Sequence, residues 1–178
     1  AAMQPVAADI TGIDIAKPGI QMAARSLPGM TWLVASAAAL PLADASIDVV
    51  TSLFSPLPIA EMTRVLRPGG YVLAVTPAPD HLWQLRNGLF ETVRAHEPDK
   101  FLKDFEAGYE LVARQEVRAP LQLDNTSLRN LLSMTPYAWK ARPERREALE
   151  QQVGFVTEAA FTVLLWRRKD SETAAPGS

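Results

Sequence analysis

The sequence contains no cysteine and only two histidines, His81 and His96. The absence of cysteine excludes disulfide bonds and thiolate zinc sites within these 178 residues, and two histidines cannot complete a metal cage without carboxylates. We therefore expect no metal site in this chain. We also expect a hydrophobic core to hold the fold together, because chains of this size bury roughly 70% of the surface that their unfolded state exposes.

Long apolar runs and excess positive charge are lacking too. The longest apolar stretches, such as 47–54, are interrupted by polar residues and fall short of the ~20 residues of a membrane-spanning helix. No basic-then-apolar leader opens the chain. The net charge is −2 and the isoelectric point is about 5.7, which is not the basic footprint of an autonomous nucleic-acid binder. These features predict a soluble, cytoplasmic protein with no membrane partner, in which any RNA contact is local or is supplied from outside this chain.

Two clusters of basic residues are candidates for such a local contact. The first is Arg142, Arg145 and Arg146, and the second, at the end of the last apolar run, is Arg167, Arg168 and Lys169. The alternative is that both are solvated faces or strand ends, as most charge clusters are.

The first half of the chain alternates between strand and helix patterns. An apolar run over 9–15 contains Asp14 near its end and leads into a helix that begins near Pro18, and further strands are predicted over 31–35, 47–54 and 71–76. A helix is predicted over 59–66, before the stop signal at 67–70. This alternation favours an α/β fold with a mostly parallel sheet and helices on both faces.

The second half predicts a helix from Asp80 to about His96 with Asp80 as its N-cap, and another over 127–133. Strands are predicted over 109–117 and 158–166, with a segment punctuated by proline over 134–143. We expect one domain over 1–169 and a disordered tail over 170–178, which is small and polar.

Four features of the first half would meet at the carboxyl edge of the sheet, where open α/β folds bind ligands. Asp14 is an acceptor for the two hydroxyls of a ribose, or alternatively caps the following helix. The small residues of 34–41 would admit a flat ring, and the strand over 47–56 would form a floor. The last feature, at 61–73, is a helix, a glycine turn and a strand, with no chemistry of its own.

Together, in this order and spacing, these four features resemble the class I S-adenosylmethionine-dependent methyltransferases. The resemblance implies that Asp14 holds the cofactor ribose, that Ile15 packs beside the adenine, and that the backbone of Ser36 and Ala37 reads the adenine edge. It places Phe54 at the cofactor as well. The family often has an acidic residue at the position of Ser36, and a hydroxyl makes a weaker acceptor there.

Three later motifs, Thr76 to Leu82, Met134 to Trp139 and Leu165 to Arg168, look like the bacterial RlmA family of 23S ribosomal RNA (guanine-N1) methyltransferases. This resemblance implies that His81 lies over the cofactor, although it could instead bond within its own loop. It makes Tyr137 and Trp139 candidates to hold a flipped guanine above a floor that includes Ser55, the alternative being peripheral core packing. His96 is expected to be structural, and no residue is assigned as the base that accepts the N1 proton.

The resemblance also implies parts that the sequence lacks. The glycine-rich cofactor turn and the first strand of the family are not found ahead of Gly12, and neither is the zinc domain that precedes them in RlmA enzymes. In the family fold this first strand lies between the strand that ends at Asp14 and the strand that ends near Phe54. We therefore expect a longer native polypeptide and a Rossmann-like, mostly parallel sheet that lacks its first strand and whose last strand is antiparallel.

These observations predict S-adenosylmethionine-dependent methyl transfer to N1 of a guanine in a 23S ribosomal RNA hairpin, with a homodimer left open. Two alternatives remain. One is a class I methyltransferase that acts on a small molecule, because the first half of the chain would look the same. The other is a catalytically inactive fragment or scaffold, which would bind no cofactor.

Overall fold

The computed structural model describes residues 9–97 and 101–170, which form two sheets and several short helices. Strands β1 (Thr11–Asp14) and β2 (Thr31–Val34) are parallel and are connected by helix α1 (Lys17–Ser26). The second sheet has the order β3-β4-β6-β5, with β3 at Ile47–Leu53, β4 at Leu66–Pro77, β5 at Tyr109–Leu123 and β6 at Phe155–Arg168. β3 and β4 are parallel, whereas β6 is antiparallel to both of its neighbours, which confirms the predicted α/β sheet and its antiparallel last strand.

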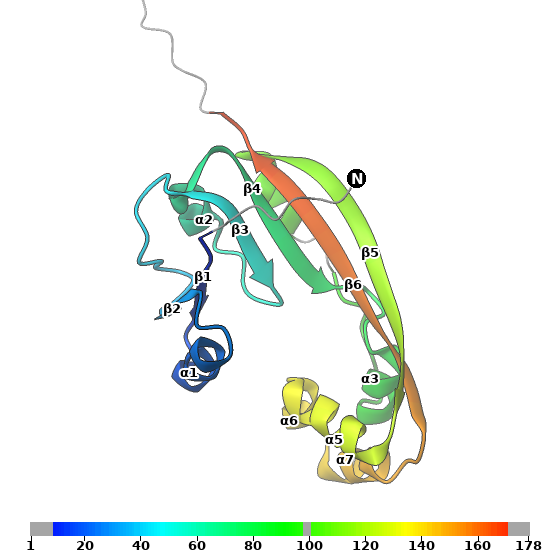
Figure 1. Cartoon of the computed structure of the whole chain (residues 1–178). Coiled ribbons are helices and arrows are strands. Elements are labelled where there is room, and N and C mark those ends of the chain that lie inside the picture. Colours follow the sequence, from blue (N-terminus) through cyan, green and yellow to red (C-terminus); the bar gives the residue numbers. More distant parts are fainter. Residues whose placement is uncertain (1–8, 98–100, 171–178) are drawn as a thin grey trace, which may run out of the picture.

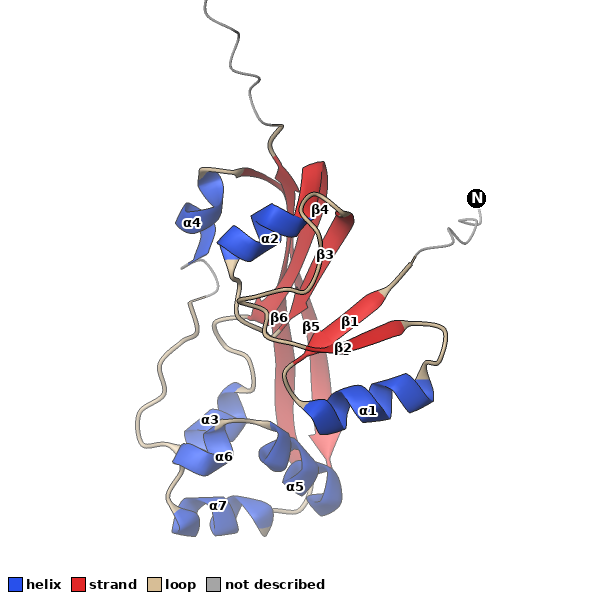
Figure 2. Ribbon diagram, turned by 90° about the vertical axis from the view of Figure 1, so that its left-hand side faces the viewer, coloured by secondary structure: helices blue, strands red, loops and turns tan. Residues whose placement is uncertain are grey.

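The helices lie on both sides of the strands and at one end of them. Helices α2 (Ile59–Val65) and α4 (Leu102–Glu106) cover one side of the larger sheet, and α1 lies on the other side of the strand layer (Figure 2). Four further helices gather where the antiparallel pair of β5 and β6 extends past β4 (Figure 1). We call this group the helical cap: α3 (Trp83–Leu89), α5 (Asn125–Met134), α6 (Tyr137–Lys140) and α7 (Pro143–Glu150).

The core consists of two clusters, one for each of these regions. Alternate residues of β4 face α2 and α4, so that Val72 and Ala74 are fully buried beside the stacked rings of Phe105 and Trp166, whose centroids lie 4.3 Å apart. The second cluster joins the cap helices to the end of the β5–β6 strand pair. Its buried members are Leu82, Leu85, Leu89, Leu128, Leu132, Leu149 and Phe155. The cap therefore has a hydrophobic core of its own.

The helix predicted from Asp80 to His96 is wrong at both ends. α3 covers only Trp83–Leu89, and Leu82 precedes it in a left-handed conformation with φ of 50°. Asp80 is not a cap, because its carboxylate binds the Arg118 guanidinium at 2.8 Å. Arg86 ends the helix early: its buried guanidinium donates to the carbonyls of Pro79, His81 and Arg94, which folds the chain after α3 back over the helix.

Other differences concern short elements and strand lengths. The sequence pattern missed α4, α6 and α7, and its two last strands were too short, because β5 extends to Leu123 and β6 begins at Phe155. Helices of four to eight residues are too short to be stable alone and are held by packing, which local periodicity does not report. The tail expected to be disordered lies outside the described residues from 171 onward. Among the residues described, no helix is long and apolar enough to cross a membrane.

The two sheets are separate where the sequence predicts a missing strand. In the described ranges no backbone ladder joins β1 or β2 to β3. This arrangement agrees with the expectation that the strands ending at Asp14 and near Phe54 are not direct neighbours. Their carboxyl ends nevertheless lie on the same side of the molecule, toward the helical cap (Figure 1).

Candidate active site

The carboxyl ends of β1 and β2 bring four of the predicted site residues together. Asp14 pairs with Val34 in the ladder, and the amide of Ala35 donates to the Asp14 carbonyl at 3.1 Å. Ile15, Ser36 and Ala37 follow directly after these two strand ends. Asp14 and Ser36 are exposed, and the Ile15 residue is 76% exposed, so this edge presents a carboxylate and an apolar side chain to a ligand.

The Asp14 carboxylate has a structural role and room for a binding role. Its Oδ1 atom accepts a hydrogen bond from the amide of Ala16 at 2.7 Å, which shapes the turn into α1. The helix N-cap itself is Ala16, so Asp14 organises the approach to the helix and is not its cap. A carboxylate has about four acceptor sites, so acceptor capacity remains for a ribose hydroxyl. Ser36, in contrast, has its Oγ atom 3.2 Å from the amide of Ala38 and accepts a bond within its own loop.

A continuous row of rings extends from the end of β3 to the helical cap. Phe54 lies 5.1 Å from Phe161, and Phe161 lies 4.8 Å from His81, measured between ring centroids. The row continues from His81 to His96 at 6.4 Å and from His96 to Tyr137 at 6.2 Å. We call these five residues the ring row. Phe54 is its exposed end, at 60% exposure, in a left-handed conformation with φ of 55° that turns the chain out of β3.

The ring row contains three residues that the sequence predicted and two that it did not assign to the site. Phe54, His81 and Tyr137 were candidates, and the structure joins them through Phe161 and His96. Phe161 lies in an apolar strand and therefore gave no separate signal. The expectation that His96 is structural agrees with its contact to the Tyr137 hydroxyl, which lies 2.9 Å from its Nε2 atom.

The electrostatics of the row keep both imidazoles neutral at pH 7. Burial lowers the pKa of His81, and the positive charge of Arg86 lowers it further, although the backbone of Ala160 opposes this. The pKa of His96 falls to about 4, first through burial, then through the charge of Arg86, and then through the charge that His81 carries when it is protonated at low pH. The Nδ1 atom of His81 lies 2.9 Å from the carbonyl oxygen of Ala160 in β6, so the ring bonds to a strand and not within its own loop.

Arg86 is a functional-site candidate that the sequence analysis missed. Its residue is 6% exposed, its side chain donates only to carbonyls among the described residues, and its guanidinium lies over the rings of Trp83 at 5.5 Å and Tyr137 at 5.8 Å. A buried cation without a carboxylate partner is costly unless its donors are satisfied. The available signal was an arginine within the apolar stripe of α3, between Leu85 and Leu89.

Trp139 and Ser55 do not join the row. Trp139 is 82% exposed and makes no ring contact to a described residue, so the alternative of peripheral core packing is wrong for it. Tyr137, by comparison, packs against the second core cluster and is half-buried. Ser55 is exposed and follows Phe54, and its carbonyl accepts from the Ser52 hydroxyl at 3.4 Å.

The second basic cluster predicted for RNA is bound into the fold. Arg168 donates to the Leu66 carbonyl, and Lys169 donates to the Glu106 carbonyl at 2.8 Å. Arg167 lies 3.9 Å from Asp170. The strand-end interpretation therefore describes this cluster.

Comparison with known proteins gives the class of this domain. Residues 1–74 match the family model described as a methyltransferase domain. The fold is similar to that of the YcgJ protein of Bacillus subtilis, with a TM-score of 0.60 and 17% identity over 92% of this chain and 83% of that chain. A Bacillus halodurans protein described as a candidate methyltransferase gives a TM-score of 0.59 with 16% identity over 91% and 84% of the two chains. The described chain thus has the fold of the class I methyltransferases, a class whose methyl donor is S-adenosylmethionine, and its first 74 residues match a methyltransferase domain.

Among curated proteins, the chain is similar to enzymes of one particular kind. It is 34% identical to a 23S rRNA (guanine(748)-N(1))-methyltransferase of Streptomyces fradiae over 134 residues, which is 74% of this chain and 48% of that protein. It is 35% identical over 143 residues to a Bacillus subtilis protein described as a candidate 23S rRNA (guanine-N(1)-)-methyltransferase, covering 79% of this chain and 51% of that one. The chain thus resembles RlmA-type enzymes and spans about half the length of these relatives.

A third relative has a different printed activity. The phthiotriol/phenolphthiotriol dimycocerosates methyltransferase 1 of Mycobacterium ulcerans is 38% identical, but over only 84 residues, which is 42% of this chain and 31% of that protein.

Proposed function

We propose that this chain is part of an enzyme that transfers a methyl group from S-adenosylmethionine to N1 of a guanine in 23S ribosomal RNA. The observation that carries the proposal is the extent of the similarity. The family model ends at residue 74, whereas the similarity to the Streptomyces fradiae and Bacillus subtilis proteins covers about three quarters of the chain. That similarity therefore continues into the half that builds the helical cap and most of the ring row.

The adenosine part of the cofactor fits the edge formed by β1, β2 and β3. Asp14 would accept from the ribose hydroxyls, Ile15 would pack against the adenine, and the backbone of Ser36 and Ala37 would contact the adenine edge. Phe54 and His81 would enclose the cofactor from the ring row. The cofactor supplies a sulfonium-bound methyl group, and the chain's residues align the acceptor with it in a pocket that excludes water.

The guanine would leave its stack and enter the space beside the ring row, because enzymes that modify bases hold them outside the helix between aromatic or apolar side chains. Tyr137 and Trp139 would contact the base, and Ser55 would lie at its floor. Trp139 is 82% exposed, so its ring is accessible to a base that has left its stack.

Guanine N1 carries a proton that must be removed. The neutral imidazole of His81 is suited to accept it, since its lowered pKa leaves a lone pair available at pH 7. The Nδ1 atom lies 2.9 Å from the Ala160 carbonyl oxygen and 3.2 Å from the Ala160 amide nitrogen. In the tautomer in which Nδ1 donates to the carbonyl, the Nε2 atom of the same ring is the acceptor.

The second candidate function is methyl transfer to a small molecule, which the Mycobacterium ulcerans relative favours. One assay distinguishes the two functions. We expect the full-length protein, given labelled S-adenosylmethionine, to label a 23S ribosomal RNA hairpin and none of a panel of small-molecule acceptors. Labelling of the panel alone would establish the second function. Failure to bind S-adenosylmethionine at all would support the inactive-scaffold alternative.

A further inference from the structure

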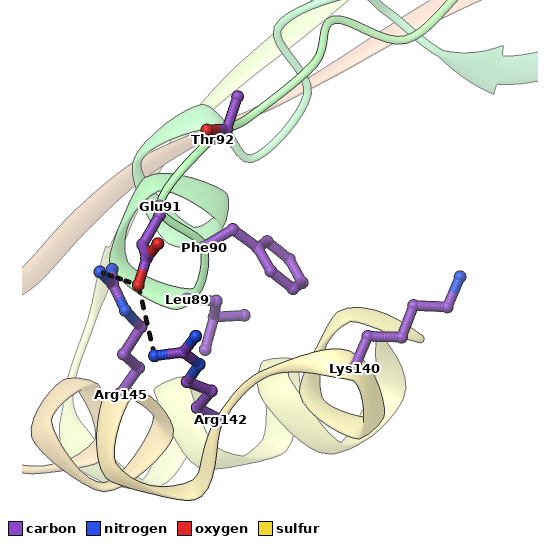
Figure 3. A pocket seen from close by; sticks show the side chains of 7 residues that line it. All are labelled: Leu89, Phe90, Glu91, Thr92, Lys140, Arg142 and Arg145. Carbon is purple, nitrogen blue, oxygen red and sulfur yellow. Dashed lines mark ion pairs between the residues drawn. The ribbon is translucent and has the colours of Figure 1, made fainter.

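A basic pocket of about 240 Å³ opens between the end of α3 and the start of α7 (Figure 3). Its wall on one side is the chain that leaves α3, with Leu89, Phe90, Glu91 and Thr92. Its other wall carries three cations, Lys140, Arg142 and Arg145. In Figure 3 the Phe90 ring lies between the Arg142 side and the Lys140 side, so the pocket has an aromatic surface flanked by positive charge.

The charges inside this pocket are only partly compensated. Glu91 is the carboxylate that pairs with both guanidiniums in the described part of the chain, at 3.4 Å to Arg142 and 3.6 Å to Arg145. Strong charge-assisted hydrogen bonds measure about 2.7–2.9 Å, and each guanidinium has five donors, so one carboxylate at these distances leaves most donors available. With three cations and one anion, the pocket has an excess of two positive charges.

This excess contrasts with the chain as a whole, whose net charge is −2. The structure also separates the members of the basic cluster that the sequence singled out. Arg142 and Arg145 face the pocket, whereas Arg146 lies on the same helix but bonds Glu150 at 2.7 Å. The pocket therefore concentrates the charge that a local RNA contact needs, and Arg146 provides an internal control.

We propose that this pocket binds a phosphodiester group of the RNA strand next to the target nucleotide. The inference rests on the proposed function and deepens it. The pocket adjoins the ring row because Lys140 and Tyr137 are the two ends of α6, one helical turn apart. In addition, Leu89 and Phe90 lie at the end of α3, the helix that carries Arg86, and the Arg86 guanidinium lies over the Tyr137 ring. A guanidinium pair matches the geometry of phosphate oxygens, and the Phe90 ring can pack against the adjoining sugar or base.

The test measures binding of a 23S ribosomal RNA hairpin to the full-length protein by fluorescence anisotropy at several salt concentrations. Arg142→Ala, Arg145→Ala and Lys140→Ala should each weaken RNA binding about tenfold. The slope of the logarithm of the binding constant against the logarithm of the salt concentration should become shallower by about 0.7 for each phosphate contact to single-stranded RNA that is lost. The matched control, Arg146→Ala, removes the same charge from the same helix and should change affinity less than about twofold. The affinity for S-adenosylmethionine should stay unchanged in all four variants.

A fifth variant keeps the test decisive if an alanine variant folds poorly. Glu91→Gln removes the one carboxylate of the pocket, so RNA should bind several-fold more tightly and with a steeper salt dependence. Equal losses in the pocket variants and in Arg146→Ala, or no losses in either, would overturn the pocket assignment and leave the proposed function standing. A wild-type protein that binds S-adenosylmethionine but no RNA would overturn both.

Discussion

The edge of the small sheet and the helical cap hold their parts of the proposed site in different ways. Asp14, Ile15 and Ser36 are exposed and are placed by the backbone of two strand ends. His96 and Tyr137, in contrast, hold each other through side chains, above the buried Arg86 and the second core cluster. The cofactor edge should therefore tolerate substitution with little loss of stability, whereas substrate recognition in the cap depends on packing.

The largest expected effect concerns the core of the cap. Leu128→Ala removes a fully buried side chain of α5 and should lower the free energy of unfolding by about 2–5 kcal/mol. Met134→Ala, on the same helix at 81% exposure, is the matched control and should change it by less than about 0.5 kcal/mol. Urea unfolding measures both. A similar loss in the two variants would mean that the second cluster is not a core.

The next largest effect concerns substrate recognition by Trp139, an exposed side chain of the cap that is not part of its hydrophobic core. Trp139→Ala should lower methyl transfer to RNA by about 100-fold, because the stacking of one base on an aromatic ring is worth about 1–3 kcal/mol. The affinity for S-adenosylmethionine, measured by calorimetry, and the unfolding midpoint should not change, since the ring is 82% exposed. Unchanged turnover would remove Trp139 from the site.

At the cofactor edge, Asp14→Ala should weaken S-adenosylmethionine binding about tenfold, which corresponds to the loss of a hydrogen bond to a charged group. Asp14→Asn keeps an oxygen that can accept from the amide of Ala16 but removes the negative charge. It therefore distinguishes the contribution of the turn into α1 from the contribution of the charge. We expect Asn to restore any stability lost in the Ala variant but not the full affinity. Full affinity in both variants, by calorimetry, would show that Asp14 serves only the turn.

The smallest effect is the pH dependence that His96 contributes to stability. Its pKa in the folded protein is about 4, below the ordinary value of 6.5, so the unfolded state binds more protons between these values. The contribution of neutral His96 is complete above pH 6.5 and is lost as the pH falls toward 4. His96→Gln cannot titrate but can still bond the Tyr137 hydroxyl. Its unfolding midpoint in urea should therefore fall less than the wild-type midpoint between pH 7 and pH 5, and an equal fall would contradict the assignment.

The parts of the fold that the sequence predicts well are those whose periodicity is local. The run from Ile47 to Leu53 marks β3 without reference to the rest of the chain. The turn predicted at Gly69 and Gly70 is wrong, because both residues lie inside β4, which begins at Leu66. The end of α3 is different, because Arg86 stops it by gathering carbonyls from residues up to eight positions away. Such a buried cation breaks the helix pattern through packing that no short window contains.

The candidate site divides in the same way. Asp14 is recognisable because a carboxylate at a strand end has a definite chemical meaning in this fold class. Phe161 and His96 could not be assigned, since they join the ring row only through the register of β6 and the return of the chain after α3. The structure pairs Arg142 and Arg145 with Glu91, whereas Arg146 pairs with Glu150. This difference depends on how α7 is rotated relative to Glu91, which the order of residues alone does not predict.

The activity proposed for this protein is methylation of N1 of a guanine in 23S ribosomal RNA. The most direct measurement is to incubate the full-length protein with a 23S ribosomal RNA transcript and S-adenosylmethionine that carries an isotope-labelled methyl group, then digest the RNA and analyse its nucleosides by mass spectrometry. Our account predicts labelled 1-methylguanosine as the product. Label in another nucleoside, or an RNA that stays unlabelled while a small molecule is methylated, would contradict it.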